Sequence, residues 1–347
     1  MYPPLEIAKN LNIADIKDRS IAKKYLTMML DENSDLFYML CTDKTFGTER
    51  YDGPYREFSQ YIHAQWKNLY RWATGYEPER DVFNKSNRAT VIDAFVGMVL
   101  CSRWNKYKAV YRFDSELELS LAAVDKVRLP VNILKNLPYR NFYLEFAPDG
   151  IFKDAFHGCF LDISWHGNNL LLKLMRLTDD LRAMSGMGDF NIDMSEDEPY
   201  LTLLREDVDG CHEQDVNGLR TDWEEFCFFV INAVMYLCAS NADIKSVDPS
   251  HILSYPHKVN KGDVPLAAYE CGYVYGQDVR LMKVQKSAEY NGNPGRVRKS
   301  PRPHPVKASW QHYWKGSGEN KKRVLLFKDP YFVGAGADYA TIRKVVK

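Results

Sequence analysis

Apolar side chains recur at helical spacing through the N-terminal part of the chain. They gather near one face between Asp15 and Asp31, and the aromatic residues from Tyr55 to Trp72 have a similar spacing. A third run with this period extends from Ala89 to Trp104. The polar segment from Glu77 to Asn87 contains a proline and is the best candidate for a boundary or hinge. The pattern therefore predicts amphipathic helices on both sides of a boundary near residue 80.

After Trp104 the pattern changes to short runs rich in aromatic and branched residues, separated by turn residues, which is typical of β-strands. One apolar helix interrupts these runs, because Thr221 and Glu224 fit a capping box just before an apolar stretch that ends at Cys238. The expected strands cover residues 109–113, 141–147, 156–163, 170–177, 266–275, 279–285, 323–327 and 331–333.

The predicted fold class is α+β, with a helical N-terminal region followed by an antiparallel sheet packed with one major helix. The corresponding domains are residues 1–80 and an α+β core over residues 81–347. That core includes a basic, aromatic C-terminal ribbon at residues 280–323. A chain of 347 residues, of which 45% are hydrophobic, is long enough to bury a sizeable core.

Charge is balanced over the whole chain but segregated along it. The chain has 46 basic and 46 acidic side chains, which excludes a protein that coats nucleic acid through bulk charge. Residues 189–215 hold ten acids and one base, whereas residues 280–323 hold twelve lysines or arginines and two acids. Any binding of a polyanion must therefore be local, and the basic ribbon is the segment suited to it.

The basic ribbon mixes cations, imidazoles and aromatic rings without the period of a core segment. Its prolines exclude a continuous helix, so we expect a long extended loop with polyproline character between two strands. Guanidinium groups can contact phosphates or carboxylates, and flat rings can stack on bases or prolines. The candidate partner-binding or RNA-binding residues are Arg296, Arg298, Lys299, Arg302, Pro303, His304, Trp310, Tyr313, Trp314 and Gly316.

The same side chains could instead pin a loop to the sheet. Trp310 and Trp314 are four residues apart and could both bury against the core, with His304 bonded to a backbone carbonyl. Binding and structural roles therefore both stay open for these residues.

Catalytic and metal-binding alternatives use the same or nearby residues. His304 and His312 could act as general acid and base of a ribonuclease. The same two histidines could bind a metal ion, but their spacing matches no standard zinc pattern. The acids of residues 189–215 could hold magnesium for a nuclease, although such runs are usually solvated loops. No nucleotide-binding fingerprint is visible. We therefore expect no cofactor and no metal, and we assign no catalytic residue.

The seven cysteines form no C-x-x-C pair, which indicates reduced thiols. Cys101, Cys227 and Cys238 fall in apolar helical runs, so we expect them in the core. The longest apolar run, from Phe226 to Ala239, is too short to span a bilayer, and charge interleaves the segment from Met1 to Leu30 where a signal peptide would be apolar. These features predict a cytoplasmic protein without a membrane contact.

An ordered set of short motifs adds a resemblance to a known family. R-P-H at residues 302–304, W-x-x-Y-W-x-G at 310–316 and P-x-F-V at 330–333 are the C-terminal members of the set. The preceding members are Trp104-Asn105 with Val110-Tyr111, Asn136-Leu137-Pro138 with Tyr143, Leu237-Cys238 with Asp243-Ile244, and Pro256-His257-Lys258. Over residues 85–347 the chain resembles a type V-A anti-CRISPR family of phages and plasmids, the one that suppresses biosynthesis of the CRISPR effector nuclease.

The resemblance implies that the protein recognises the N-terminal peptide of the effector during translation and causes destruction of the corresponding mRNA, in the cytoplasm of the bacterial host. The implied partners are that peptide together with the mRNA, the ribosome or a host nuclease. Histidines commonly flank the family's equivalent of Trp310, whereas Ser309 and Gln311 flank it here, which argues against imidazole catalysis or metal binding. The matching positions that form a functional cluster are Arg302, His304, Trp310, Tyr313, Trp314 and Gly316.

The leading hypothesis is therefore a non-enzymatic anti-CRISPR inhibitor that binds a nascent peptide. The alternatives are a ribonuclease and a generic RNA-binding module, both of which would use the basic, aromatic C-terminal segment. Intrinsic cleavage of RNA by the purified protein distinguishes the first alternative, and salt-sensitive binding that ignores peptide sequence distinguishes the second.

Overall fold

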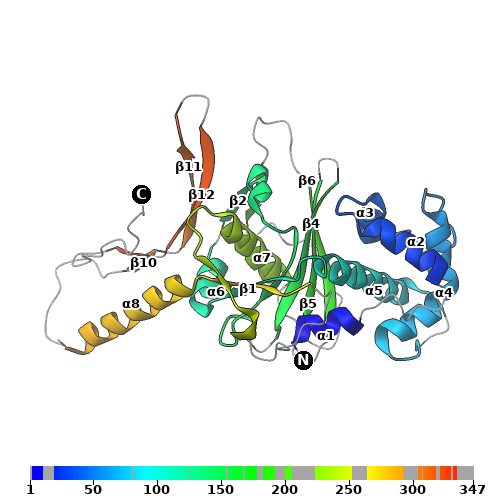
Figure 1. Ribbon diagram of the computed structural model, residues 1–347, viewed down its shortest axis with the longest axis horizontal. Coiled ribbons are helices and arrows are strands. Elements are labelled where there is room, and N and C mark those ends of the chain that lie inside the picture. Colours follow the sequence, from blue (N-terminus) through cyan, green and yellow to red (C-terminus); the bar gives the residue numbers. More distant parts are fainter. Residues whose placement is uncertain are drawn as a thin grey trace.

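The computed structural model describes most of the chain (Figure 1). The described residues are 2–10, 19–79, 82–124, 126–153, 155–166, 169–177, 183–191, 200–204, 223–251, 264–292, 304–306, 308–317, 321–329 and 331–333.

Five helices open the fold: α1 (Pro3–Asn10), α2 (Arg19–Met29), α3 (Asp35–Thr42), α4 (Arg56–Thr74) and α5 (Lys85–Trp104). The three helices predicted from periodicity are confirmed as α2, α4 and α5, whereas α1 and α3 were not predicted. Local capping sets several ends, because the side chains of Ser34 and Asn84 accept the backbone N–H groups that open α3 and α5. Gly75 ends α4 in the left-handed region.

A seven-stranded sheet follows, with the strand order β6-β5-β4-β3-β1-β9-β8. Its strands are β1 (Ala109–Phe113), β3 (Asn141–Glu145), β4 (Gly158–His166), β5 (Asn169–Leu177), β6 (Ala183–Asn191), β8 (Ile244–Val247) and β9 (Ala267–Cys271). The α+β class is confirmed, but the sheet is not purely antiparallel. The central strand β1 runs parallel to both β3 and β9, and the other neighbouring pairs are antiparallel.

Helices cover both faces of the sheet (Figure 1). Alternate side chains of β1 point to opposite faces, so that Tyr111 joins one core and Val110 joins the other. The first core is built with α6 (Ser115–Ala122), α7 (Trp223–Cys238) and α8 (Tyr273–Gly292). The second core is built with α1 to α5, and α4 packs directly on α5. The domain boundary expected near residue 80 stays a prediction.

The major helix expected on the sheet is confirmed as α7, whose described side chains are buried on all sides. Thr221 of the predicted capping box lies outside the described residues. The six described cysteines are free thiols, and Cys101, Cys227 and Cys238 are buried as expected.

The strand expected at residues 279–285 is wrong, because these residues belong to α8. Asp243, distant in sequence, begins this helix by accepting the backbone N–H groups of Val274 (2.7 Å) and Tyr275 (3.2 Å). The strand before it, β9, therefore ends at Cys271. Long-range capping overrode the alternating pattern from which a strand was predicted.

The long loop expected in the basic ribbon is also wrong where the structure describes it. β11 (Ser309–Lys315) and β12 (Lys322–Lys328) form an antiparallel hairpin that projects from the body (Figure 1). β10 (His304–Val306), which was not predicted, pairs with β13 (Tyr331–Val333). The two predicted C-terminal strands, at residues 323–327 and 331–333, are confirmed as β12 and β13. The prolines at 301 and 303 precede these strands and did not prevent a nearby ladder.

The remaining elements are small, and they include a two-stranded ladder between β2 (Lys126–Pro130) and β7 (Tyr200–Leu204). Two 3₁₀ helices cover Val131–Asn136 and Pro249–His251. Within the described part of the chain, no helix has both the length and the apolar character needed to cross a bilayer.

Candidate functional site

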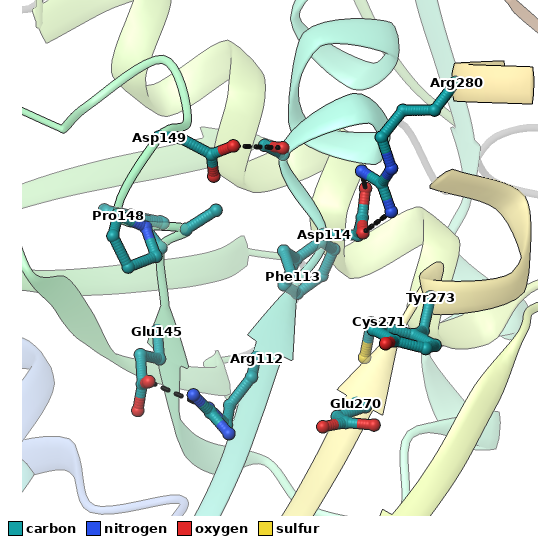
Figure 2. Close-up of a pocket in the computed structure, with 13 residues that line it drawn as sticks. Arg112, Phe113, Asp114, Glu145, Pro148, Asp149, Glu270, Cys271, Tyr273 and Arg280 are labelled. Carbon is teal, nitrogen blue, oxygen red and sulfur yellow. Dashed lines mark hydrogen bonds and ion pairs between the residues drawn. The ribbon is translucent and has the colours of Figure 1, made fainter. Parts of the chain in front are cut away.

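A cleft of about 290 Å³ opens at the carboxyl ends of the three parallel strands β3, β1 and β9 (Figure 2). Each of these apolar strands carries one charged residue near its end, and the strand register aligns them as a row. Arg112 pairs with Glu145 on one side and with Glu270 on the other. The carboxyl edge of parallel strands is the usual location of ligand crevices in open sheets with parallel strands.

Both arginines of the cleft are already engaged by carboxylates (Figure 2). Arg112 Nε donates to Glu145 Oε1 at 2.8 Å. Arg280 holds Asp114 through two bonds of 3.0 and 2.9 Å. Tyr2 also donates its hydroxyl to Glu145, and burial together with this carboxylate raises the pKa of Tyr2. These contacts fix the walls of the cleft and connect one of them to the N-terminus.

Two further carboxylates of the cleft, on Asp149 and Glu270, make no ion pair among the described residues, although Arg112 and Lys245 lie opposite Glu270 on the neighbouring strands. Asp149, in the turn after β3, accepts a hydrogen bond from the Ser115 hydroxyl at 3.2 Å. Within the described part of the chain, the Glu270 carboxylate makes neither a hydrogen bond nor an ion pair. Four carboxylates face two guanidinium groups, so the cleft carries an excess of negative charge.

Part of the positive charge counted in the ribbon is compensated within the fold. Arg280 and Lys283 project from α8 onto α6, where Arg280 binds Asp114 and Lys283 binds Glu116 at 2.7 Å. These two cations therefore position α8. Their charge is neutralised by carboxylates, so they add less to polyanion binding than the count of twelve basic residues suggested.

The cleft is lined by two side chains of the types that act as nucleophiles, Cys271 and Ser115. Cys271 lines it, but burial raises the pKa of this thiol well above its usual value, so it stays protonated and poorly nucleophilic. Ser115 is the one serine that lines the described part of the cleft, and its hydroxyl donates a hydrogen bond to Asp149. Among the described residues that line the cleft there is no histidine to act as a general base near neutral pH.

A buried carboxyl supports the turn that carries Asp149. Glu118 of α6 accepts the backbone N–H of Ala147 at 2.6 Å and that of Ile151 at 3.2 Å. Burial raises the pKa of Glu118 to about 8, although the two backbone bonds act in the opposite direction. A side chain at Gly150 would overlap this carboxylate, which explains the glycine in the turn.

The raised pKa of Glu118 predicts that stability falls as pH rises. Between about pH 4.5 and about pH 8 the folded protein binds one more proton at this residue than the unfolded chain, so unfolding becomes easier with pH. The loss should be on the order of a few kcal/mol across this interval. Urea unfolding at a series of pH values should show this slope in the wild type and a flatter one in Glu118→Gln. Equal slopes in the two proteins would contradict it.

At the base of the hairpin, Trp310 has a structural role in the fold. Its indole Nε1 donates to the buried Asn232 Oδ1 at 2.7 Å, and its ring lies 4.9 Å from that of Phe327. Asn241 makes two further bonds to the backbone of Phe327, which fasten the hairpin to the turn after α7. These contacts agree with the structural alternative for Trp310, in which its ring packs against the core.

We expect Trp310→Ala to lower the free energy of unfolding by about 3 kcal/mol, because it removes a large packed ring and leaves the buried Oδ1 of Asn232 without a donor. Trp310→Phe keeps a ring beside Phe327 and loses only the N–H donor, so its cost should be about 1 to 2 kcal/mol. Urea titration of both variants measures the two losses. Wild-type stability in Trp310→Ala would contradict the anchoring role.

The far end of the hairpin is exposed and rich in cations and rings. We use the name hairpin tip for Tyr313, Trp314, Lys315, Lys321, Lys322 and Arg323. The side chains of Tyr313 and Trp314 are 44% and 60% exposed. The guanidinium carbon of Arg323 lies 5.7 Å from the centre of the Trp314 ring, so a cation and an open aromatic face lie together.

The other predicted site residues are placed only in part. The backbone of His304 lies in β10, and Gly316 follows β11 with a φ of 104°, which is a region that favours glycine. The acids of residues 189–215 lie mostly outside the described segments, and the described residues contain no cluster of three or more potential metal ligands. Arg296, Arg298, Lys299, Arg302 and Pro303 lie outside the described residues.

Sequence reasoning missed the cleft altogether. The signal was a single charged residue near the end of three otherwise apolar strands, at Arg112, Glu145 and Glu270. Only the pairing of the strands shows that these positions form one row.

The sequence of this chain matches a known family of proteins. The sequence model of the anti-CRISPR type V subtype A2 (AcrVA2-like) family matches residues 111–335, which hold the sheet, the cleft and the hairpin. The protein is thus an anti-CRISPR protein. Because the match covers more than half of the 347 residues, the chain belongs to the anti-CRISPR type V subtype A2 family, and its role is directed at type V-A CRISPR systems.

A solved structure described as the crystal structure of AcrVA2 is similar to this chain at 16% sequence identity. The match has a TM-score of 0.42 and covers 80% of this chain and 96% of that one. No curated protein matches the chain.

Proposed function

We propose that this protein reduces production of the type V-A effector nuclease by recognising its N-terminal peptide during translation and causing loss of the mRNA. The observation that carries the proposal is membership in the anti-CRISPR type V subtype A2 family over residues 111–335. The protein would act in the cytoplasm of the host cell, where the effector is translated. It would need one surface for a peptide and a second for RNA, the ribosome or a host nuclease.

Two features of the structure support the proposal of two separate binding surfaces. The cleft is a small, charged recess of the size that a peptide end or side chain fills. The hairpin tip offers exposed rings beside cations, the combination with which proteins bind single-stranded nucleic acid. Tyr313 and Trp314 remain in the proposed functional cluster, and Trp310 holds the hairpin that presents them.

The test measures effector mRNA in cells that express this protein, for the native coding sequence and for one whose start codon is removed. Loss of the mRNA only when translation proceeds supports the proposal. Loss in both cases points to a ribonuclease that acts without a peptide. Persistence of the translated mRNA in cells that make the folded protein contradicts the proposal.

The hairpin tip favours one second candidate, a generic RNA-binding module. Such a module would bind single-stranded RNA with an affinity that falls steeply with salt, whatever peptide is present. Binding that depends on the effector peptide argues against this candidate.

A further inference from the structure

We propose that the cleft at the ends of β3, β1 and β9 binds a primary ammonium group carried by a peptide. This rests on the proposed function, because it names the chemical group of the effector peptide that the protein recognises.

The charges that line the cleft favour a cationic ligand, even with Lys245 opposite Glu270 on β8. Arg112 and Arg280 are each engaged by a carboxylate, through Glu145 and Asp114. Glu270 keeps an unpaired carboxylate in the described structure, at a position that is only partly exposed. A half-buried carboxylate without a partner gains more from a bound cation than a fully solvated one does.

The available ligands favour an ammonium group over a metal ion. The described residues provide no group of three or more histidine, cysteine or acidic side chains that could hold a metal. An ammonium group needs less, because its three N–H donors can be shared between one carboxylate and neighbouring oxygens. Glu270 on β9 supplies the carboxylate for this contact, while Asp149, in the turn after β3, lies on the opposite side of the cleft and adds negative charge there (Figure 2).

The remaining lining suits the carbon atoms that accompany such a group. Tyr273 lines the cleft with a side chain that is 52% exposed, at the start of α8 (Figure 2). An open tyrosine ring near a carboxylate favours cations through its π face. Phe146 and Pro148 add apolar surface on the other side. A volume of about 290 Å³ admits a chain end or one long side chain and excludes a folded domain.

A peptide offers two sources of this chemistry, its α-amine and the side chain of a lysine. We would titrate the purified full-length protein with a fluorescent synthetic peptide that has the N-terminal sequence of the effector. Three forms of the peptide separate the sources: unmodified, acetylated at the α-amine only, and acetylated at each lysine only. Acetylation removes the positive charge while the rest of the peptide is kept.

The variant is Glu270→Gln, and the matched control is Glu79→Gln, which changes an exposed acid in the segment between α4 and α5. Loss of a charge-assisted bond should weaken binding of the unmodified peptide by at least about tenfold in Glu270→Gln and leave it unchanged in Glu79→Gln. Acetylation of the contacted amine should weaken binding to the wild type similarly and have little further effect in Glu270→Gln. Thermal unfolding of both variants verifies that they are folded.

The outcomes separate this inference from the function on which it rests. If the peptide binds equally well to the wild type and to Glu270→Gln, or if neither acetylation weakens binding, the ammonium site is wrong while peptide recognition stands. If the unmodified peptide does not bind the wild type at all, peptide recognition by the free protein and the ammonium site both fail.

Discussion

Replacing Arg103 by methionine is expected to destabilise the protein by about 3 to 5 kcal/mol, because it leaves the Asp162 carboxylate buried without its charged partner. Both side chains are fully buried, and Arg103 Nη1 donates to Asp162 Oδ2 at 2.6 Å. The same guanidinium donates twice to the carbonyl of Met29, and it lies 4.3 Å from the ring of Phe37. One side chain of α5 thus joins α2 and α3 to strand β4.

Burial raises the pKa of Asp162, and Arg103 acts to lower it. Without the arginine this buried carboxyl must take up a proton or stay charged with only the neutral donors of Asn141 and Ser164 beside it, and either costs stability. Arg71→Met is the matched control, because the ion pair of Arg71 with Glu77 is exposed and should contribute less than about 1 kcal/mol. Urea unfolding compares the two variants. A loss below about 1 kcal/mol in Arg103→Met would contradict the role of this pair.

Replacing Trp314 by alanine is expected to abolish most of the loss of effector mRNA while leaving the protein folded. The Trp314 side chain is 60% exposed, so its removal should change the free energy of unfolding by less than about 1 kcal/mol. Its stacking face beside Arg323 should contribute about 1 to 3 kcal/mol to contact with a base, so the variant should bind about five- to 150-fold more weakly. Quantitative measurement of the effector mRNA in cells that make equal amounts of each protein checks this.

Tyr76→Ala is the matched control for Trp314→Ala, because Tyr76 is an exposed aromatic residue, far along the chain in the segment after α4. This variant should retain full activity. Trp314→Phe should retain part of it, since a smaller ring still stacks. Full activity of Trp314→Ala at wild-type expression would remove the hairpin tip from the mechanism.

The elements that could be predicted from the sequence are those with strong local signals. Helices α4, α5 and α7 have long apolar periods, and β1 and β4 are dense in aromatic and branched residues. In contrast, α8 exposes Leu281 and Val284 and depends on Asp243 and on ion pairs to α6, so its own pattern was ambiguous. The short helices α1 and α3 contain only eight residues each, too few to show a clear period.

Only part of the candidate site could be predicted from the sequence. The composition of the ribbon drew attention to Trp310 and Trp314, but it could not separate them, because β11 buries one ring against Phe327 and leaves the other at the hairpin tip. The cleft depends on side chains that are more than a hundred positions apart, such as Arg112 and Glu270, and on the parallel pairing of their strands. No local pattern contains that pairing.

The most direct test of nascent-peptide recognition separates the peptide from the RNA that encodes it. We would measure reporter mRNA in cells that express this protein, for two versions of the effector's N-terminal coding segment fused to the reporter. In one version synonymous codons replace the native ones throughout, so the peptide is kept and the RNA is changed. In the other a frameshift, restored before the reporter, changes the peptide and keeps nearly all of the RNA. We expect loss of the first mRNA and persistence of the second, whereas persistence of the first and loss of the second would contradict recognition of the peptide.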